Sequence, residues 1–387
     1  MKIRYAPNMA SSGISGCRRS APRTPWQGLL LLALILSAAS PLAAQDAATG
    51  PGIVGDYVIR NFKFASGEVL PELRLHYRTL GQPKRDASGV VRNAVLIMHG
   101  TTGSGSQFLS PVFANELYGA GQPLDTTRHY IVLPDDIGHG QSSRPSDGLR
   151  ARFPRYNYDD MVDANHRLLT DKLDVTHLRL VMGTSMGGMH SWVWAERYPD
   201  FMDGVVPLAS APTQIAGRNR MIRRMAMDDI RDDPEWKNGE YTKQPPGMRA
   251  AMQMLFIMTT APLVQQRDAP TRDAADSLIT RFLDGRMRTM DANDFLYAFD
   301  ASRDYNPEPM LDRIKAPVLA INSADDLVNP PELGIVERLI ARVPRGRFLL
   351  VPISEKTRGH GTHTVAAIWK APFTEFLASL PVLPTLR

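Results

Sequence analysis

The stretch LRLVMGTSMGGMHSWVWAERYP, residues 178–199, joins an apolar run to a helical pattern through a glycine-rich turn. Its centre, GTSMG at 183–187, fits the pattern G-x-S-x-G. When a strand precedes this pattern and a helix follows it, the serine lies on a sharp turn that exposes its hydroxyl above the sheet. A side chain at Gly183 or Gly187 would clash where the strand and the helix pack closely. The stretch therefore predicts that Ser185 is a nucleophile, placed at a helix N-terminus that favours negative charge.

Short apolar runs recur on both sides of this turn. Runs that are bounded by glycine or proline and lack polar alternation are typical of strands buried on both faces of a parallel sheet. Helical stretches such as 158–173 and 332–343 separate them, and 56–62 and 70–81 predict an opening antiparallel pair. This alternation predicts an α/β fold, a mostly parallel sheet with helices on both faces. The runs are residues 93–100, 129–138, 177–183, 204–210, 316–322 and 347–353.

One connection between predicted core strands is far longer than the others. Residues 211–315 fill it, and they hold ten of the eighteen methionines. The pattern predicts helices over 217–230, 247–260 and 274–287. These helices form either an extra packing layer or a lid whose flexible methionines line an apolar pocket. We expect a helical lid insert, since ligands of open α/β sheets bind beyond the carboxyl ends of the strands.

The first 44 residues differ in composition from the rest of the chain. Arg18, Arg19 and Arg23 precede the apolar run GLLLLALILSAA (28–39), and small residues follow it. This order is typical of a secretory signal peptide. The apolar run is shorter than the roughly 20 residues that span a membrane. We expect cleavage near Ala44, a periplasmic or secreted protein and no stable membrane insertion, with a retained anchor as the alternative. The core then comprises residues 45–210 and 316–387.

The composition excludes several classes of function. The net charge of +5 includes basic residues of the signal segment, so the mature chain lacks the basic surface that binds nucleic acid. The single cysteine, Cys17, also lies in that segment, so a core without disulfides must stabilise the mature protein. No thiolate metal site is available, and no pair of histidines has ligand spacing beside an acid. We therefore expect no metal and no cofactor.

A serine hydroxyl needs a base, and the base needs an acid that orients it. In folds with this serine turn, the acid and then the histidine follow the serine along the chain. One predicted strand runs into SADDLVNPPE, where Asp326 stands four residues before a proline, the usual spacing, and Asp325 is the alternative. The last predicted strand is followed by SEKTRGHGTHT. It offers His360 as the base in a Gly-His step, with His363 as the alternative.

Two backbone N–H groups are needed to stabilise the negative oxygen of a tetrahedral intermediate. One belongs to the residue after the nucleophile, Met186, and the other to the loop after an earlier strand. The loop MHGTTGSGSQF, residues 98–108, has this position, and the amide of Thr101 is the expected donor. A flexible turn is the alternative. His139, in PDDIGHGQSS, precedes the serine in the chain, so we expect it to shape the wall of the site.

Beyond these motifs, GTSMGGMHSWVWAERYPD resembles the nucleophile region of homoserine O-acetyltransferases, a branch of the α/β-hydrolase superfamily. The resemblance covers roughly residues 60–380. It implies an α/β-hydrolase fold with Ser185, Asp326 and His360 as the triad, and it is compatible with the homodimers that family members often form through lid helices. Arg224 lies where a family arginine contacts the amino-acid substrate, and Arg223 competes for that position. Similar segments are FPRYNYDDMV, RNRMIRRMAMDDIRDDPEWKNGEY, NDFLYAFDASRDY and INSADDLVNPPEL.

Two segments depart from the family pattern. The oxyanion loop reads HGTTGSG instead of H-x-L-T-G, and a strand ends in PDDIGHGQSS instead of N-x-x-G-x-x-x-G-S. Export also separates the enzyme from cytoplasmic acetyl-CoA, the family's acyl donor. We therefore predict an exported, esterase-like serine hydrolase that acts on a small acyl ester through an acyl-enzyme. Transfer of acetyl from acetyl-CoA to homoserine or another small alcohol is the alternative. A binding protein whose triad is catalytically inactive is the third hypothesis.

Overall fold

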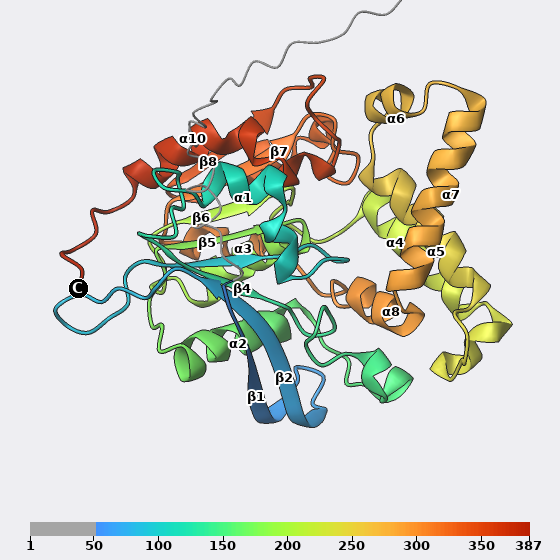
Figure 1. Cartoon of the computed structure of the whole chain (residues 1–387), viewed down its shortest axis with the longest axis horizontal. Helices are drawn as coiled ribbons and strands as arrows, with labels where there is room; N and C mark the ends of the chain where they lie inside the picture. The colour runs from blue at the N-terminus through green and yellow to red at the C-terminus, as the bar shows by residue number, and fades with distance from the viewer. Residues whose placement is uncertain (1–51) are drawn as a thin grey trace, which may run out of the picture. The chain divides into compact units, whose positions relative to one another are not determined.

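The computed structural model describes residues 52–387, which fold around an eight-stranded sheet (Figure 1). The strand order is β1-β2-β4-β3-β5-β6-β7-β8. β1 pairs antiparallel with β2, β2 pairs antiparallel with β4, and the remaining neighbours are parallel. The strands are β1 (Ile53–Lys63), β2 (Val69–Leu80), β3 (Ala94–Met98), β4 (Tyr130–Pro134), β5 (Leu180–Thr184), β6 (Val205–Leu208), β7 (Val318–Ser323) and β8 (Gly346–Val351).

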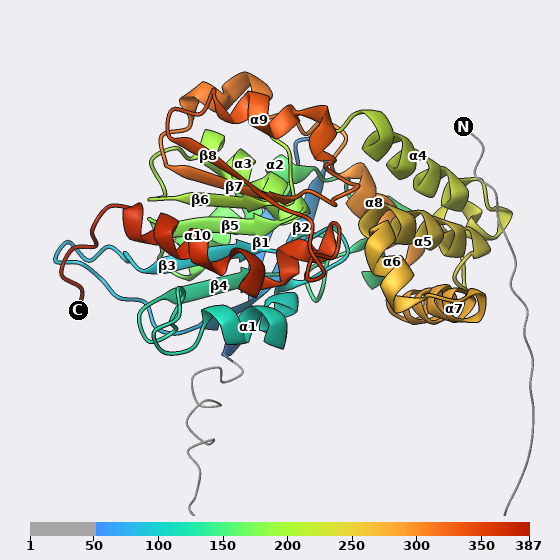
Figure 2. The same cartoon turned by 90° about the horizontal axis from the view of Figure 1, so that it is seen from above.

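Helices cover both faces of this sheet, as Figure 2 shows. One face packs against α2 (Tyr158–Arg167), α3 (Met186–Arg197) and α9 (Ile335–Ile340). The other packs against α1 (Pro111–Leu117) and α10 (Ala366–Ser379). Every residue of β3, β4, β5 and β6 is buried as a result, which explains why these strands are continuous apolar runs. The α/β fold class predicted from the sequence is confirmed, including the antiparallel pair at its start.

The parallel register brings the carboxyl ends of the central strands to one edge of the sheet. Met98 of β3 pairs with Gly183 of β5, and Gly183 pairs with Pro207 of β6. At the far side, Ser323 of β7 pairs with Val351 of β8. The loops that leave β3, β5, β7 and β8 therefore begin side by side. These loops carry the oxyanion segment, Ser185, both candidate acids and both candidate histidines.

A helical insert lies between β6 and β7, at one end of the sheet (Figures 1 and 2). It has its own apolar core, in which Met227, Met248 and Met252 pack with Phe295 and Phe299. These three methionines therefore form part of the insert's own packing layer, one of the two roles considered for them from the sequence. The predicted helices correspond to α4, α5 and α7, whereas α6 and α8 were not predicted. The helices are α4 (Gly217–Arg231), α5 (Pro246–Thr259), α6 (Pro262–Asp268), α7 (Arg272–Thr289) and α8 (Ala292–Asp300).

Three expectations concern the N-terminus, metals and membranes. The predicted signal peptide, residues 1–44, and Cys17 lie outside the described residues. Within residues 52–387, no helix combines the length and the apolar character needed to cross a membrane. In the same part of the chain, no three His, Cys, Asp or Glu side chains are grouped so that they could hold a metal ion.

Candidate active site

Ser185 lies on a tight turn between β5 and α3. Its backbone has φ +56° and ψ −111°, outside the regions that residues with a side chain favour. A Cβ on Gly183 would lie 2.2 Å from the carbonyl oxygen of Gly187, and a Cβ on Gly187 would lie 2.0 Å from that of Met98. Neither position has room for a side chain, as predicted from close packing of strand and helix. The turn thus holds the Ser185 hydroxyl at the carboxyl edge of the sheet.

His360 and Asp326 extend a chain of hydrogen bonds from Ser185. His360 Nε2 lies 2.8 Å from Ser185 Oγ, and His360 Nδ1 lies 2.9 Å from Asp326 Oδ2. Both partners are buried. Burial alone would raise the pKa of Asp326, but the adjacent His360 and hydrogen bonds from His360, Asn329 and the Val328 amide hold that pKa below its ordinary value. The carboxylate therefore stays ionised and is positioned to orient the imidazole.

The other acid and the other histidine have different surroundings. Asp325 accepts hydrogen bonds from the Ser323 hydroxyl at 2.5 Å and from the Gly359 amide at 3.0 Å. It thereby fixes the residue that precedes His360, a supporting role that the sequence reading did not assign. The ring of His363 lies 5.2 Å from that of His360, centroid to centroid. Burial and the charge of His360 lower the pKa of His363 to about 3, so this ring is neutral at pH 7.

The loop after β3 lies against the nucleophile. A Cβ on Gly100 would be 3.5 Å from the Cβ of Ser185, so the loop backbone passes close to the serine. Within the described residues, the amides of Thr101 and Met186 have no hydrogen-bond partner. The next amide, that of Gly187, donates to the His99 carbonyl at 2.9 Å. The two amides expected to form the oxyanion hole are thus both available to a substrate oxygen.

Buried polar residues after β4 hold this loop in place. Asp135 accepts hydrogen bonds from the amides of Gly105 at 2.7 Å and Gln141 at 2.8 Å. His139 Nε2 lies 2.8 Å from the carbonyl oxygen of Thr101. His139 therefore supports the expected oxyanion donor directly, which is more specific than the wall position predicted from the sequence. The motif PDDIGHG was the available signal, although its partners in the loop after β3 are distant in the chain.

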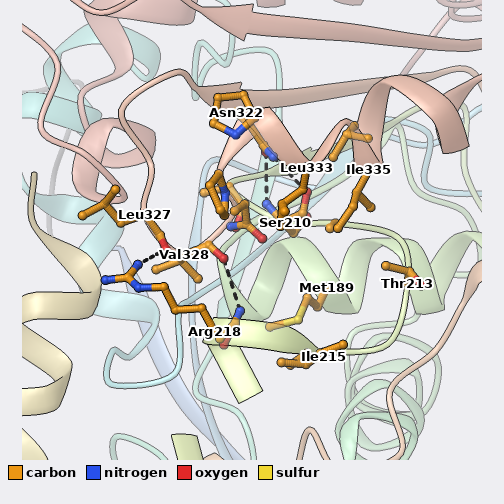
Figure 3. A pocket seen from close by; sticks show the side chains of 18 of the residues that line it. Met189, Ser210, Thr213, Ile215, Arg218, Asn322, Leu327, Val328, Leu333 and Ile335 are labelled. Carbon is orange, nitrogen blue, oxygen red and sulfur yellow. Dashed lines mark hydrogen bonds between the residues drawn. The ribbon is translucent and has the colours of Figure 1, made fainter. Parts of the chain in front are cut away.

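Two cavities meet at Ser185, and we name them by their walls. The acid-loop cavity lies between the first turn of α4, residues 327–336 after β7, and β8, and it is the one drawn in Figure 3. The insert cavity lies between the catalytic loops and α5, α7 and α8. They enclose about 840 Å³ and about 1170 Å³ of space free of atoms, their mouths included. Ser185, Arg223 and Val328 line both cavities, whereas His360 and Thr101 line the insert cavity and not the acid-loop cavity.

The structure brings Arg223, the alternative left open by the sequence, to the site, whereas Arg224 lines neither cavity. The Arg224 side chain is 66% exposed and pairs with Asp228. Arg223 is buried, donates from Nε to Asn219 at 2.9 Å and from Nη1 to the Ser302 hydroxyl at 3.3 Å, and pairs with no carboxylate among residues 52–387. Burying a charge without a counter-charge is costly. Arg223 is therefore suited to bind an anionic group of a substrate.

Comparisons with known proteins agree with this architecture. Residues 93–352 match the sequence model of the alpha/beta hydrolase fold family. The chain is 28% identical over 295 residues to a probable acyltransferase of Methanothermobacter thermautotrophicus, which covers 76% of this chain and 89% of that protein. It is 31% identical over 316 residues to a homoserine O-acetyltransferase of Pelobacter propionicus, which covers 71% of this chain and 82% of that protein.

A solved structure adds a hydrolase to these transferases. An acetylester hydrolase from Corynebacterium glutamicum superposes with a TM-score of 0.73 at 21% identity, over 87% of this chain and 98% of that chain. At this identity the likeness concerns the fold alone. Proteins named for hydrolysis and for acyl transfer thus share this fold. The chain belongs to the α/β-hydrolase family, in its homoserine O-acetyltransferase-like branch, and it is an enzyme of acyl transfer or hydrolysis.

Proposed function

We propose that this protein is an exported serine hydrolase that cleaves small acyl esters through an acyl-enzyme on Ser185. The observation that carries the proposal is the chain of hydrogen bonds from Ser185 through His360 to Asp326, with contacts of 2.8 and 2.9 Å. His360 takes the hydroxyl proton while Ser185 Oγ attacks the ester carbonyl carbon. The amides of Thr101 and Met186 then stabilise the oxyanion of the tetrahedral intermediate.

The second half of the reaction returns the enzyme to its starting state. The intermediate collapses as the imidazolium of His360 gives its proton to the departing alcohol oxygen, which leaves an ester on Ser185. A water molecule then loses a proton to His360 and attacks the acyl carbon. The second intermediate releases the carboxylic acid as His360 returns a proton to Ser185 Oγ. Asp326, ionised throughout, stabilises the imidazolium in both halves.

Transfer of the acyl group to a small alcohol that carries a carboxylate is the second candidate. Arg223 favours it, because its buried charge lacks an acidic partner in the described chain and borders both cavities at Ser185. A substrate carboxylate would supply the missing counter-charge. Homoserine is such an alcohol, and the Pelobacter relative is named for its acetylation. Acetyl-CoA would then be the donor.

Export and a lid belong to the same proposal. The order of arginines, apolar run and small residues supports a signal peptide over residues 1–44. An exported enzyme lacks a supply of acetyl-CoA, which favours water as the acceptor. The insert cavity has one wall of catalytic loops and one of insert helices, which supports a lid that limits access of water to the acyl-enzyme. Fractionation of the native host and the N-terminal sequence of the protein would test export.

The deciding experiment measures the fate of the acyl group. The purified protein is given an activated short-chain ester, with and without millimolar homoserine, and separately acetyl-CoA with homoserine. Free acid and O-acyl homoserine are quantified, with Ser185→Ala as the control. We expect mainly free acid, unaffected by homoserine and absent from the control. Acyl homoserine made from acetyl-CoA would establish the transferase instead, and no turnover above the control would refute both candidates.

A further inference from the structure

The acid-loop cavity reaches Ser185 without bordering the groups that handle protons. His360 and the loop of Thr101 line the insert cavity and are absent from the walls of the acid-loop cavity. The departing alcohol oxygen must receive its proton from His360 Nε2, so the alcohol half of an ester lies in the insert cavity. The acyl half points away from the alcohol across the same carbonyl carbon. The acid-loop cavity is the other cavity that Ser185 lines, so we assign the acyl half of the ester to it.

The wall of this cavity is mainly apolar. Met189 of α3, Ile215 before α4, and Ile335 at the start of α9 line it, and Figure 3 shows them with Leu333 around the cavity. Phe348 and Leu350 of β8 also line it. Leu333 is 60% exposed, so an apolar side chain also stands at the edge towards solvent. The cavity is therefore suited to an apolar group that extends outward from Ser185.

Several polar side chains in this wall already have partners, whereas Arg223 retains its unpaired charge. The Asn322 side chain accepts a hydrogen bond of 3.1 Å from the Ser210 amide and donates one of 3.2 Å to the Ser210 carbonyl. Arg218 Nη1 donates to the Leu327 carbonyl at 2.7 Å, and Asn329 donates to the Ala209 carbonyl at 2.9 Å. Satisfied groups offer little to a polar ligand. The hydrogen bond from Arg218 also connects α4 to the segment after β7, residues 327–336, and so holds two walls of the cavity together.

The apolar wall of the cavity has more side chains than an acetyl group can contact. The wall includes Met189 and Ile215, Ile335 near the start of α9, and Phe348 and Leu350 of β8. A single methyl group would leave most of the apolar wall without contacts. We propose that the acid-loop cavity binds a linear, apolar acyl chain of medium length, so that the enzyme prefers esters of such acids to acetyl esters. This inference rests on the proposed acyl-enzyme at Ser185.

A series of esters tests this assignment. The 4-nitrophenyl esters of acetic, butanoic, hexanoic and octanoic acid share one alcohol half and differ only in the acyl chain. We expect kcat/KM to rise about fourfold per added methylene from acetyl to hexanoyl, the gain for burying one CH₂ group. A second series, the acetate esters of alcohols of increasing length, keeps the acyl half constant. We expect a weaker dependence on length there.

Two matched substitutions locate the effect. Ile215→Trp fills the acid-loop cavity, and we expect it to lower the hexanoyl-to-acetyl ratio of kcat/KM at least about tenfold. Ile257→Trp adds the same side chain at an exposed position of α5 that borders neither cavity, and the ratio should stay at the wild-type value. Both substrates are measured on one preparation, so any loss of folded protein cancels in the ratio.

The outcomes separate this inference from the function on which it rests. If acetyl esters are cleaved in a Ser185-dependent way but kcat/KM is flat or falls with acyl length, the cavity assignment is wrong and the hydrolase stands. If Ile215→Trp instead alters the dependence on alcohol length, the two halves are assigned to the wrong cavities. If no ester of either series is cleaved above the Ser185→Ala control, the proposed hydrolase fails, and this inference fails with it.

Discussion

Asp325 and Asp326 are adjacent in the chain but contact different parts of the site. Asp326 meets the ring of His360, and Asp325 meets the amide of Gly359 one residue earlier. The sequence could rank these acids by their distance from a proline, but it could not show that the second acid has a role. That role depends on a loop 34 residues away in the chain. Sequence patterns carry no information on such pairings.

Replacement of Asp325 by alanine should misplace His360 without removing any group of the proposed triad. We expect kcat to fall about 100-fold, because a shift of about 1 Å in a catalytic group has effects of that size. Asp325→Asn keeps an acceptor for the Gly359 amide and should retain most of the activity. Asp326→Asn should cost about four orders of magnitude. Steady-state kinetics of the three variants on one ester would test this order, and equal losses in both Asp325 variants would contradict it.

Arg223 and Arg224 offer a second comparison between neighbours. Arg223→Gln should raise KM for a substrate that carries a carboxylate by about 10- to 100-fold, since a charge-assisted hydrogen bond contributes about 1.5–3 kcal/mol. Arg224→Gln changes an exposed side chain and should leave KM unchanged. The measurement compares an ester with a carboxylate in its alcohol half with its neutral analogue. Equal KM values for the two esters in the wild type would remove this role from Arg223.

At the scale of elements, β5, the Ser185 turn and α3 form one tightly packed unit. The sequence predicted this unit because its glycines, apolar run and helical pattern are local features. Helix α8 also had local signals, since Asp291 caps it and Phe295 and Phe299 stand four residues apart. α6 had none, because it has only seven residues and buries none of them. Elements with periodic burial are thus predictable, and short exposed ones are not.

Two glycine substitutions should have opposite effects on stability. In Gly187→Ala the new Cβ would lie 2.0 Å from the Met98 carbonyl oxygen, so α3 would have to move away from β3. We expect a loss of at least about 1–3 kcal/mol in the free energy of unfolding. Gly285→Ala, inside α7, meets open space and should stabilise the protein by about 0.5–1 kcal/mol. Urea denaturation measures both, and a neutral Gly187→Ala would show that this contact is not rigid.

At the scale of the whole molecule, the sequence predicted which loops meet but not which side chains face inward. Parallel strands bring their carboxyl ends together, so the edge that carries Ser185, Asp326 and His360 followed from the strand order along the chain. The choice between Arg223 and Arg224 depends on how α4 rotates against α8. The two cavities depend on the positions of six or more segments at once. Such arrangements arise from tertiary packing and leave no pattern in one stretch of sequence.

The buried polar support of the oxyanion loop should make the stability of the protein sensitive to acid. Burial lowers the pKa of His139 to about 4, against about 6.5 in an unfolded chain. Between these values the unfolded state binds one proton more than the folded state. This histidine therefore reduces the free energy of unfolding by about 1.4 kcal/mol for each unit that the pH falls, from about 6.5 to about 4.

Replacement of His139 by glutamine removes this titration and keeps a donor for the Thr101 carbonyl. We expect the slope of unfolding free energy against pH to become shallower by about 1.4 kcal/mol per unit between pH about 6.5 and about 4. Urea denaturation of the wild type and the variant at several pH values across this window measures the slope. An unchanged slope would mean that His139 titrates alike in the folded and unfolded states.

The helical insert leaves β6 and returns at β7, two strands that are neighbours in the sheet. Ser185, Asp326 and His360 all lie outside it, while it supplies Arg223 and one wall of the insert cavity. Residues 217–300 are thus inserted in the chain at a single gap between adjacent strands, and side-chain hydrogen bonds such as Ser146 to Asp294 and Arg218 to the Leu327 carbonyl hold them against the core. In the proposed hydrolase, changes confined to the insert alter the alcohol that is recognised and leave the residues that transfer protons unchanged.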